Sequence, residues 1–126
     1  MEVIAKFAIP IPPITKKNHQ RIFKNRSTGK PFVAPSEQYK AYEDAALWFI
    51  PKRSSPIDFP VNVKAVFFMP NNRPCDLTNL LEAIDDVMVK AGLLKDDNYK
   101  IISSHDQSRV LVDKLNPRTE ILITRL

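Results

Sequence analysis

An apolar strand followed by an amphipathic helix, in the middle of the chain, constrains the fold most. Residues 61–69 alternate at first and then become apolar throughout, as in a strand at the centre of a sheet. After a loop at residues 70–74, apolar side chains recur at helical spacing over residues 77–91, and Gly92 is suited to end a helix. A helix that must bury one face beside such a strand predicts a sheet covered by helices.

The flanking segments predict further elements of the same sheet. Residues 3–11 predict a strand that ends in a proline-rich segment, and residues 25–30 predict a turn between two short strands. Ser36 is a suitable N-cap for a second helix that ends at Pro51. The apolar face of that helix would carry Tyr39, Tyr42, Ala46 and Phe49.

The end of the chain completes the expected architecture. Residues 95–99 predict a polar turn, and residues 100–104 and 119–124 predict two closing strands. We therefore expect a single domain over residues 1–126, of the α/β (α+β) class. Its mixed sheet would have about four to six strands, with two main helices packed on it.

The composition narrows the class of protein. A chain of 126 residues with 44% hydrophobic residues can build one packed core. It has no run of about 20 apolar residues and no signal pattern, so we expect a soluble cytoplasmic protein with no membrane contact. The only cysteine, Cys75, cannot form an internal disulfide and is interpreted as a packing residue.

The basic residues are concentrated in one segment, residues 16–30, which we call the basic arm. The net charge of +5 is a weak indication of an anionic partner, whereas a cluster of cations without acidic neighbours is a stronger one. We expect this arm to contact DNA phosphates, and the alternative is a solvated loop. The predicted contacts are Lys16, Lys17, Asn18, Arg21, Lys24, Arg26 and Lys30.

The acidic residues are concentrated in a second segment, which we call the acidic centre. Half of the 14 carboxylates lie there: Asp76, Glu82, Asp85, Asp86, Asp96, Asp97 and Asp106. Mg²⁺ prefers oxygen ligands and activates water for attack on a phosphodiester. On the helix, Asn79, Glu82, Asp86 and Lys90 fall opposite the leucines, at spacings of three and four residues. The pattern is therefore typical of a metal-dependent enzyme that acts on a polyanion.

The same carboxylates also have purely structural interpretations. Asp76 could be only a helix N-cap, and Glu82 and Asp86 could form a solvated helix face. Asp96 and Asp97 could be ordinary turn residues. The pattern alone leaves these alternatives open.

Several correctly spaced segments together resemble the RusA-type Holliday junction resolvases. They are Pro74-Cys75-Asp76-Leu77-Thr78-Asn79-Leu80, then Ala83, Asp86, Lys90-Ala91-Gly92 and Asp96-Asp97, with Pro12-Pro13 and Lys17-Asn18 before them and residues 118–123 after. The resemblance implies a RusA-like fold and a homodimer that makes paired symmetric nicks in four-way DNA junctions. It also implies Mg²⁺ and no other small-molecule cofactor, a role in DNA recombination and repair, and a place at the nucleoid.

The resemblance assigns roles to four residues of the motif. Asp76 takes the place of the first catalytic aspartate, Asp97 that of the aspartate that ends the Asp-Asp pair, and Asn79 that of the motif asparagine. Asp96, the first member of the pair, is a further metal-ligand candidate.

Two positions depart from the family motif. Thr78 stands where the family has a second aspartate, and Glu82 stands where it has a lysine. Because a threonine hydroxyl is a weak ligand, we hypothesise that Glu82, one helical turn further on, restores a catalytic and metal-binding carboxylate.

The missing lysine has no obvious replacement in the sequence. Lys17, Lys90 and Lys95 are candidates, and His105 with Asp106 could add a proton carrier or be a local hydrogen-bonding pair. The departures leave two other functions open, namely a non-catalytic protein that binds four-way junctions and a small metal-dependent nucleotide phosphohydrolase.

Overall fold

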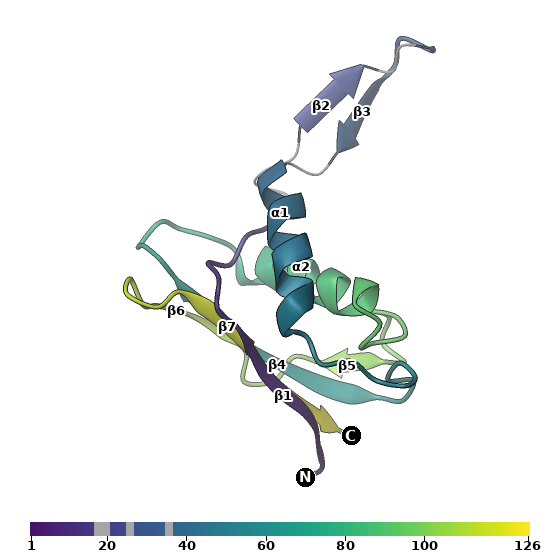
Figure 1. Cartoon of the computed structure of the whole chain (residues 1–126), viewed down its shortest axis with the longest axis vertical. Coiled ribbons are helices and arrows are strands. Elements are labelled where there is room, and N and C mark those ends of the chain that lie inside the picture. Colours follow the sequence, from purple (N-terminus) through teal and green to yellow (C-terminus); the bar gives the residue numbers. More distant parts are fainter. Residues whose placement is uncertain (17–20, 25–26, 35–36) are drawn as a thin grey trace.

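The computed structural model describes residues 1–16, 21–24, 27–34 and 37–126, and the side chains of all of these except residues 21–24 and 31–34. The elements, shown in Figure 1, are β1 (Val3–Ile9), β2 (Arg21–Lys24), β3 (Pro31–Ala34), α1 (Glu37–Ala46), the 3₁₀ turn η2 (Leu47–Phe49), β4 (Val61–Met69), α2 (Leu77–Lys90), β5 (Ile102–Ser104), β6 (Arg109–Val112) and β7 (Arg118–Arg125).

The main sheet has five strands and is mixed. Its order is β1-β7-β4-β5, with β6 also paired to β4. β7 is antiparallel to both β1 and β4, whereas β5 and β6 are parallel to β4. The sequence prediction of a mixed sheet with two main helices is confirmed, although β6 was not predicted.

β5 and β6 share one edge of β4, and a serine side chain occupies the interval between them. β5 pairs with the start of β4, and β6 pairs with its end. Between them the Ser108 hydroxyl accepts a hydrogen bond from the Ala65 amide at 3.0 Å and donates to the Val63 carbonyl at 3.4 Å. The side chain therefore satisfies two β4 backbone groups that neither strand reaches.

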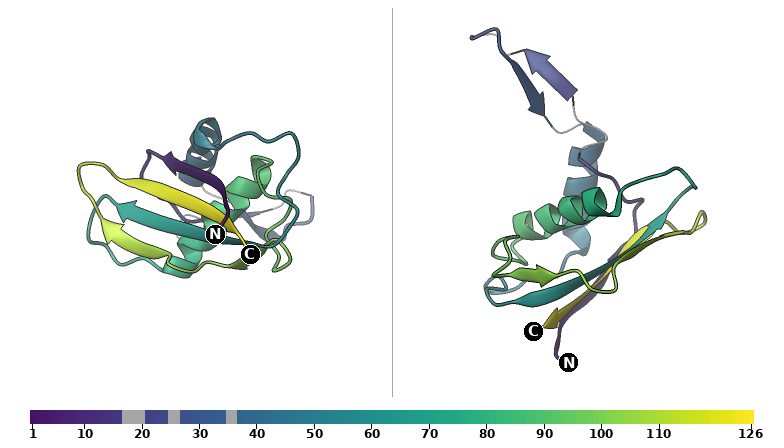
Figure 2. Two further views of the ribbon diagram at one scale, coloured as in Figure 1. Left: turned by 90° about the horizontal axis from the view of Figure 1, so that it is seen from below. Right: turned by 180° about the vertical axis from the view of Figure 1, so that it is seen from behind.

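The core lies between one face of the sheet and the two helices (Figure 2). Because side chains alternate along a strand, every second residue of β4 faces the helices: Val61, Val63, Ala65 and Phe67 are all buried. α2 covers them with an apolar stripe at helical spacing, which consists of Leu80, Ala83, Ile84, Val87 and Met88. None of the helices in the described part of the chain has the length and apolar character of a membrane span.

Helix α1 differs from its prediction at its C-terminal end. α1 ends at Ala46 and continues as η2, well before Pro51. Tyr39, Tyr42 and Ala46 are buried as predicted, but Phe49 is 44% exposed. Placing Phe49 on the buried face was wrong, because the tighter 3₁₀ turn changes the direction of the side chains that follow Ala46. Ser36, the predicted N-cap, lies outside the described residues.

A separate two-stranded hairpin carries part of the basic arm. β2 and β3 pair antiparallel, and Figure 1 shows them projecting from the body beyond α1. Gly29, in the turn between them, has a φ of 70°, a conformation that glycine adopts without steric cost. The predicted turn between two short strands is therefore confirmed.

Candidate active site

Asp76 lies at the start of α2, directly after the loop that leaves β4. It occupies the N-cap position with extended backbone angles, but its side chain makes no capping hydrogen bond to the helix. Its Oδ2 accepts a hydrogen bond from Asn79 Nδ2 at 3.3 Å, and the residue is exposed. Asp76 thus stands at the N-cap position without capping the helix through its side chain, and the motif asparagine donates to its exposed carboxylate. Its catalytic role stays a prediction.

Thr78 and Glu82 lie on the exposed side of α2. Both residues are exposed and are four positions apart, so their side chains share one face of the helix. Glu82 therefore shares a helix face with Thr78, and its role as a metal ligand stays a prediction.

Asp96 and Asp97 lie in the turn between α2 and β5. Asp96 Oδ1 accepts a hydrogen bond from the Asp97 amide at 2.7 Å, and its Oδ2 accepts one from Asn98 Nδ2 at 3.0 Å. Asp96 therefore organises the turn with both of its oxygens. Asp97 is exposed, and its backbone is fixed by this contact.

The three candidate lysines differ in their surroundings. Lys90 forms ion pairs with Glu43 at 2.9 Å and with Asp86 at 3.6 Å. Lys95 lines a hollow of about 320 Å³ that also includes Asp96. Lys17 lies outside the described residues. Of the two lysines that can be compared, Lys95 is the one beside the Asp96–Asp97 turn.

Asp85 and His105 form a pair that the sequence interpretation missed. The Asp85 side chain on α2 is 9% exposed, and His105 Nε2 lies 2.9 and 3.1 Å from its two oxygens. Burial raises the pKa of Asp85, His105 lowers it, and the nearby charge of Asp97 raises it further. His105 thus pairs with a residue 20 positions back, whereas the backbone of Asp106 is bound by the side chain of Asn62.

Replacing His105 by alanine is expected to lower the free energy of unfolding at pH 7 by about 2 kcal/mol, because it leaves the Asp85 carboxylate buried without this partner. The raised pKa means that folded Asp85 holds its proton more tightly than the unfolded chain does. Without His105 the pKa of folded Asp85 rises further, so the penalty applies fully above this higher pKa and fades as the pH falls towards the pKa that Asp85 has in the unchanged protein. Urea unfolding at several pH values measures this deficit.

The matched control for His105→Ala is the double variant with Asp85→Asn, which removes the charge as well as its partner. The double variant should lose less free energy of unfolding at pH 7 than the single variant does, and its loss should be nearly independent of pH. A deficit of the single variant that stays constant with pH would contradict this account of the pair.

Lys16, at the root of the basic arm, is paired with α2. Its Nζ lies 2.8 Å from Asp86 Oδ2, and the Tyr39 hydroxyl donates to the same oxygen at 3.4 Å. Burial favours a higher pKa for Asp86, but Lys16 and Lys90 outweigh it and the pKa is lowered. Asp86 and Lys90 therefore connect α2 to Lys16 and to α1, and only part of the predicted polar face of α2 faces solvent.

The remaining predicted DNA contacts are only partly described. Lys30 is exposed, and its amide donates to Thr28 Oγ1 at 3.3 Å. Lys17, Asn18 and Arg26 lie outside the described residues, as do the side chains of Arg21 and Lys24.

The side chains of the acidic centre offer carboxylate oxygens, which are the ligand atoms that Mg²⁺ prefers. In the described ranges, no three His, Cys, Asp or Glu side chains form a group that could hold a metal ion. Mg²⁺, however, usually keeps several waters and is bound through one or two carboxylates together with substrate phosphates. Asp76 and Asp97 are both exposed, so each offers carboxylate oxygens of this kind, and their joint binding of one ion stays a prediction.

Comparison with known proteins identifies the family. The family model of Endodeoxyribonuclease RusA matches residues 10–124. The Crossover junction endodeoxyribonuclease RusA of Aquifex aeolicus (strain VF5) is 32% identical over 88 residues, which are 68% of this chain and 66% of that protein. The matched part is thus slightly less than two thirds of the relative's length. Because the family model covers nearly the whole chain, the protein belongs to the RusA endodeoxyribonuclease family.

Proposed function

We propose that the protein is a Mg²⁺-dependent endodeoxyribonuclease that resolves Holliday junctions and related branched DNA by paired symmetric nicks, in DNA recombination and repair. The observation that carries this proposal is Asp76, a solvent-facing carboxylate held by the motif asparagine within a chain that matches the RusA family over residues 10–124. The protein would work in the cytoplasm, at the nucleoid.

In this proposal the catalytic residues come from the two ends of α2. Asp76 and Asp97 offer carboxylate oxygens, with Glu82 as the further ligand of the hypothesis. Asn79 holds the Asp76 carboxylate, and Asp96 fixes the backbone of Asp97. A bound Mg²⁺ would supply an activated water and neutralise charge on the phosphate.

A homodimer is the assembly that the proposed reaction requires. Two symmetric nicks in a four-way junction need two equivalent active sites, and a twofold dimer supplies them in a fixed relation. Recognition would then rest on the shape of the junction and on phosphate contacts rather than on base sequence.

A cleavage assay tests the proposal directly. The purified protein is incubated with labelled four-way and linear DNA, with Mg²⁺ or with EDTA, and the products are mapped at nucleotide resolution. We expect paired nicks in the four-way DNA only with Mg²⁺. Tight binding without nicks would instead support a junction-binding protein, an alternative favoured by the two departures at Thr78 and Glu82. Turnover of free nucleotides would support a phosphohydrolase.

The basic arm gives a separate prediction about salt. Replacing Lys24, Arg26 and Lys30 by alanine should weaken junction binding and make the plot of log affinity against log salt less steep by about two to three units, because each lost phosphate contact removes roughly 0.9. Titrations at several salt concentrations measure this slope.

The matched control for the arm replaces three cations outside it and outside the acidic centre, namely Lys6, Lys52 and Arg53. This control changes the net charge equally, so it should leave the slope nearly unchanged. Equal effects of the two triple variants would show that the arm has no special part in binding.

A further inference from the structure

The loop between β6 and β7 carries an unusually exposed apolar side chain. Leu115 is 97% exposed, and Leu111 and Val112, just before the loop, are 44% and 46% exposed. Leu111 and Val112 are neighbours on β6 and point to opposite faces of the sheet, so Leu115 is the apolar side chain that stands at the tip of the loop.

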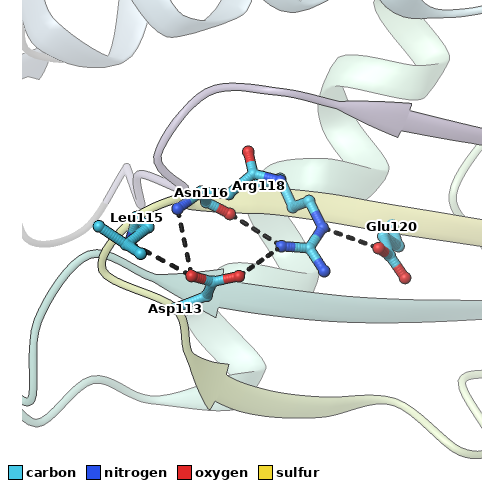
Figure 3. Close-up of polar contacts among 5 residues, drawn as sticks. All are labelled: Asp113, Leu115, Asn116, Arg118 and Glu120. Carbon is cyan, nitrogen blue, oxygen red and sulfur yellow. Dashed lines mark hydrogen bonds and ion pairs between the residues drawn. The ribbon is translucent and has the colours of Figure 1, made fainter.

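A network of polar contacts fixes this loop, as Figure 3 shows. Asp113 Oδ1 accepts hydrogen bonds from the amides of Leu115 and Asn116, both at 3.2 Å. Arg118 donates to Asp113 Oδ2 and to the Asn116 carbonyl, both at 2.9 Å, and to Glu120 at 2.7 Å. The loop is therefore ordered before any partner arrives, and little conformational entropy is lost when Leu115 is buried in a complex.

The root of the loop is joined to the sheet. The Asp113 amide donates to the Met69 carbonyl at 3.0 Å, which extends the pairing of β6 with β4. The Arg118 guanidinium lies 3.7 Å from the centre of the Phe68 ring. The tip that carries Leu115 thus stands on a rigid base rather than on a free hairpin.

The loop lies at the same end of the sheet as the segment that leads to Asp76. The chain leaves β4 at Met69 and reaches Asp76 through residues 70–75. Figures 1 and 2 show this segment and the β6–β7 loop side by side. The apolar tip therefore lies beside the segment that ends at Asp76, one of the proposed catalytic residues.

The charges around the tip suit a polyanion. Lys114, next to Leu115, is exposed, and so is Arg73 in the neighbouring segment. The two carboxylates nearby, Asp113 and Glu120, are both paired with Arg118. An apolar tip flanked by available cations is complementary to DNA, in which phosphates surround stacked bases.

We propose that the β6–β7 loop is a DNA contact in which Leu115 inserts into the base stack at the branch point of a junction. This inference rests on the proposed function and adds a residue that recognises the branch. Apolar side chains wedge between base steps in proteins that distort DNA, and the cost is lowest where the stack is already interrupted. A branch point is such an interruption, so the contact would favour branched over linear DNA.

The test uses Leu115→Ser in the full chain and a four-way junction with 2-aminopurine beside the branch point, in EDTA so that no cleavage occurs. Fluorescence should rise on binding of the unchanged protein, because the base is unstacked, and should rise far less with the variant. Junction affinity should fall by about 10- to 100-fold, the scale of one lost leucine contact. Leu115→Met should restore the signal.

Leu126→Ser is the matched control, since Leu126 is another exposed leucine, at the far end of β7. An undiminished fluorescence rise with Leu115→Ser would overturn the inference. A change of oligomeric state in that variant, seen by light scattering, would also overturn it and place the loop at an interface between two copies. Distortion that depends on Leu115 without any Mg²⁺-dependent nick would leave this inference standing while the proposed nuclease failed.

Discussion

Replacing Asp97 by asparagine is expected to lower the rate of junction cleavage by more than about 100-fold, and Asp76→Asn should do the same. Each change removes one anionic oxygen ligand but keeps the shape of the side chain. Junction binding should persist or become slightly tighter, because a negative charge that faces DNA is lost. Single-turnover cleavage and a separate binding titration in EDTA measure the two effects independently.

Asp44→Asn is the matched control for these two variants, because Asp44 is an exposed aspartate on α1, away from the acidic centre. It should cleave at the rate of the unchanged protein. Cleavage by Asp97→Asn within about threefold of that rate would remove Asp97 from the catalytic set, given that a lost ligand costs far more.

Replacing Glu82 by alanine is expected to abolish Mg²⁺-dependent cleavage and to leave junction binding intact. The reason is that Thr78 offers only a weak neutral oxygen where the family motif has an aspartate, so the carboxylate one turn away has to supply the charge. Cleavage measured over a range of Mg²⁺ concentrations would show whether the loss is one of metal affinity.

Two further variants make the test of Glu82 specific. Thr78→Asp in the Glu82→Ala background returns a carboxylate to the motif position and should restore cleavage. Glu82→Gln keeps the size and shape of the side chain but not its charge, so it separates the loss of charge from the loss of packing. Full activity of Glu82→Ala would refute the compensation hypothesis.

Much of the fold could be predicted from the sequence because its largest elements have strong periodicity. The apolar run in β4 and the stripe on α2 each have one arrangement that buries them, and the structure has that arrangement. β6 escaped prediction because it is four residues long and largely exposed, so its pattern does not differ from that of a loop. Its pairing with β4 comes from the tertiary structure rather than from its own side chains.

The candidate site was predictable only where a local motif marks it. Asp76, Asn79 and Asp97 were recognised because their spacing is fixed along the chain. The Asp85–His105 pair joins α2 to the end of β5. The two residues are 20 positions apart in the sequence, so no local sequence pattern predicts their contact. Lys16 was assigned to DNA for its charge alone, and its ion pair with Asp86 depends on how the root of the arm packs on α2.

The hydroxyl of Ser108 bears on how the protein behaves at high concentration. An open sheet edge offers unpaired amides and carbonyls to any other extended chain, and such edges are common starting points for aggregation. On this edge of β4, two short strands occupy the ends, and a side chain caps the backbone between them. The central strand of the sheet is thereby protected from intermolecular β-pairing without the need for one long edge strand.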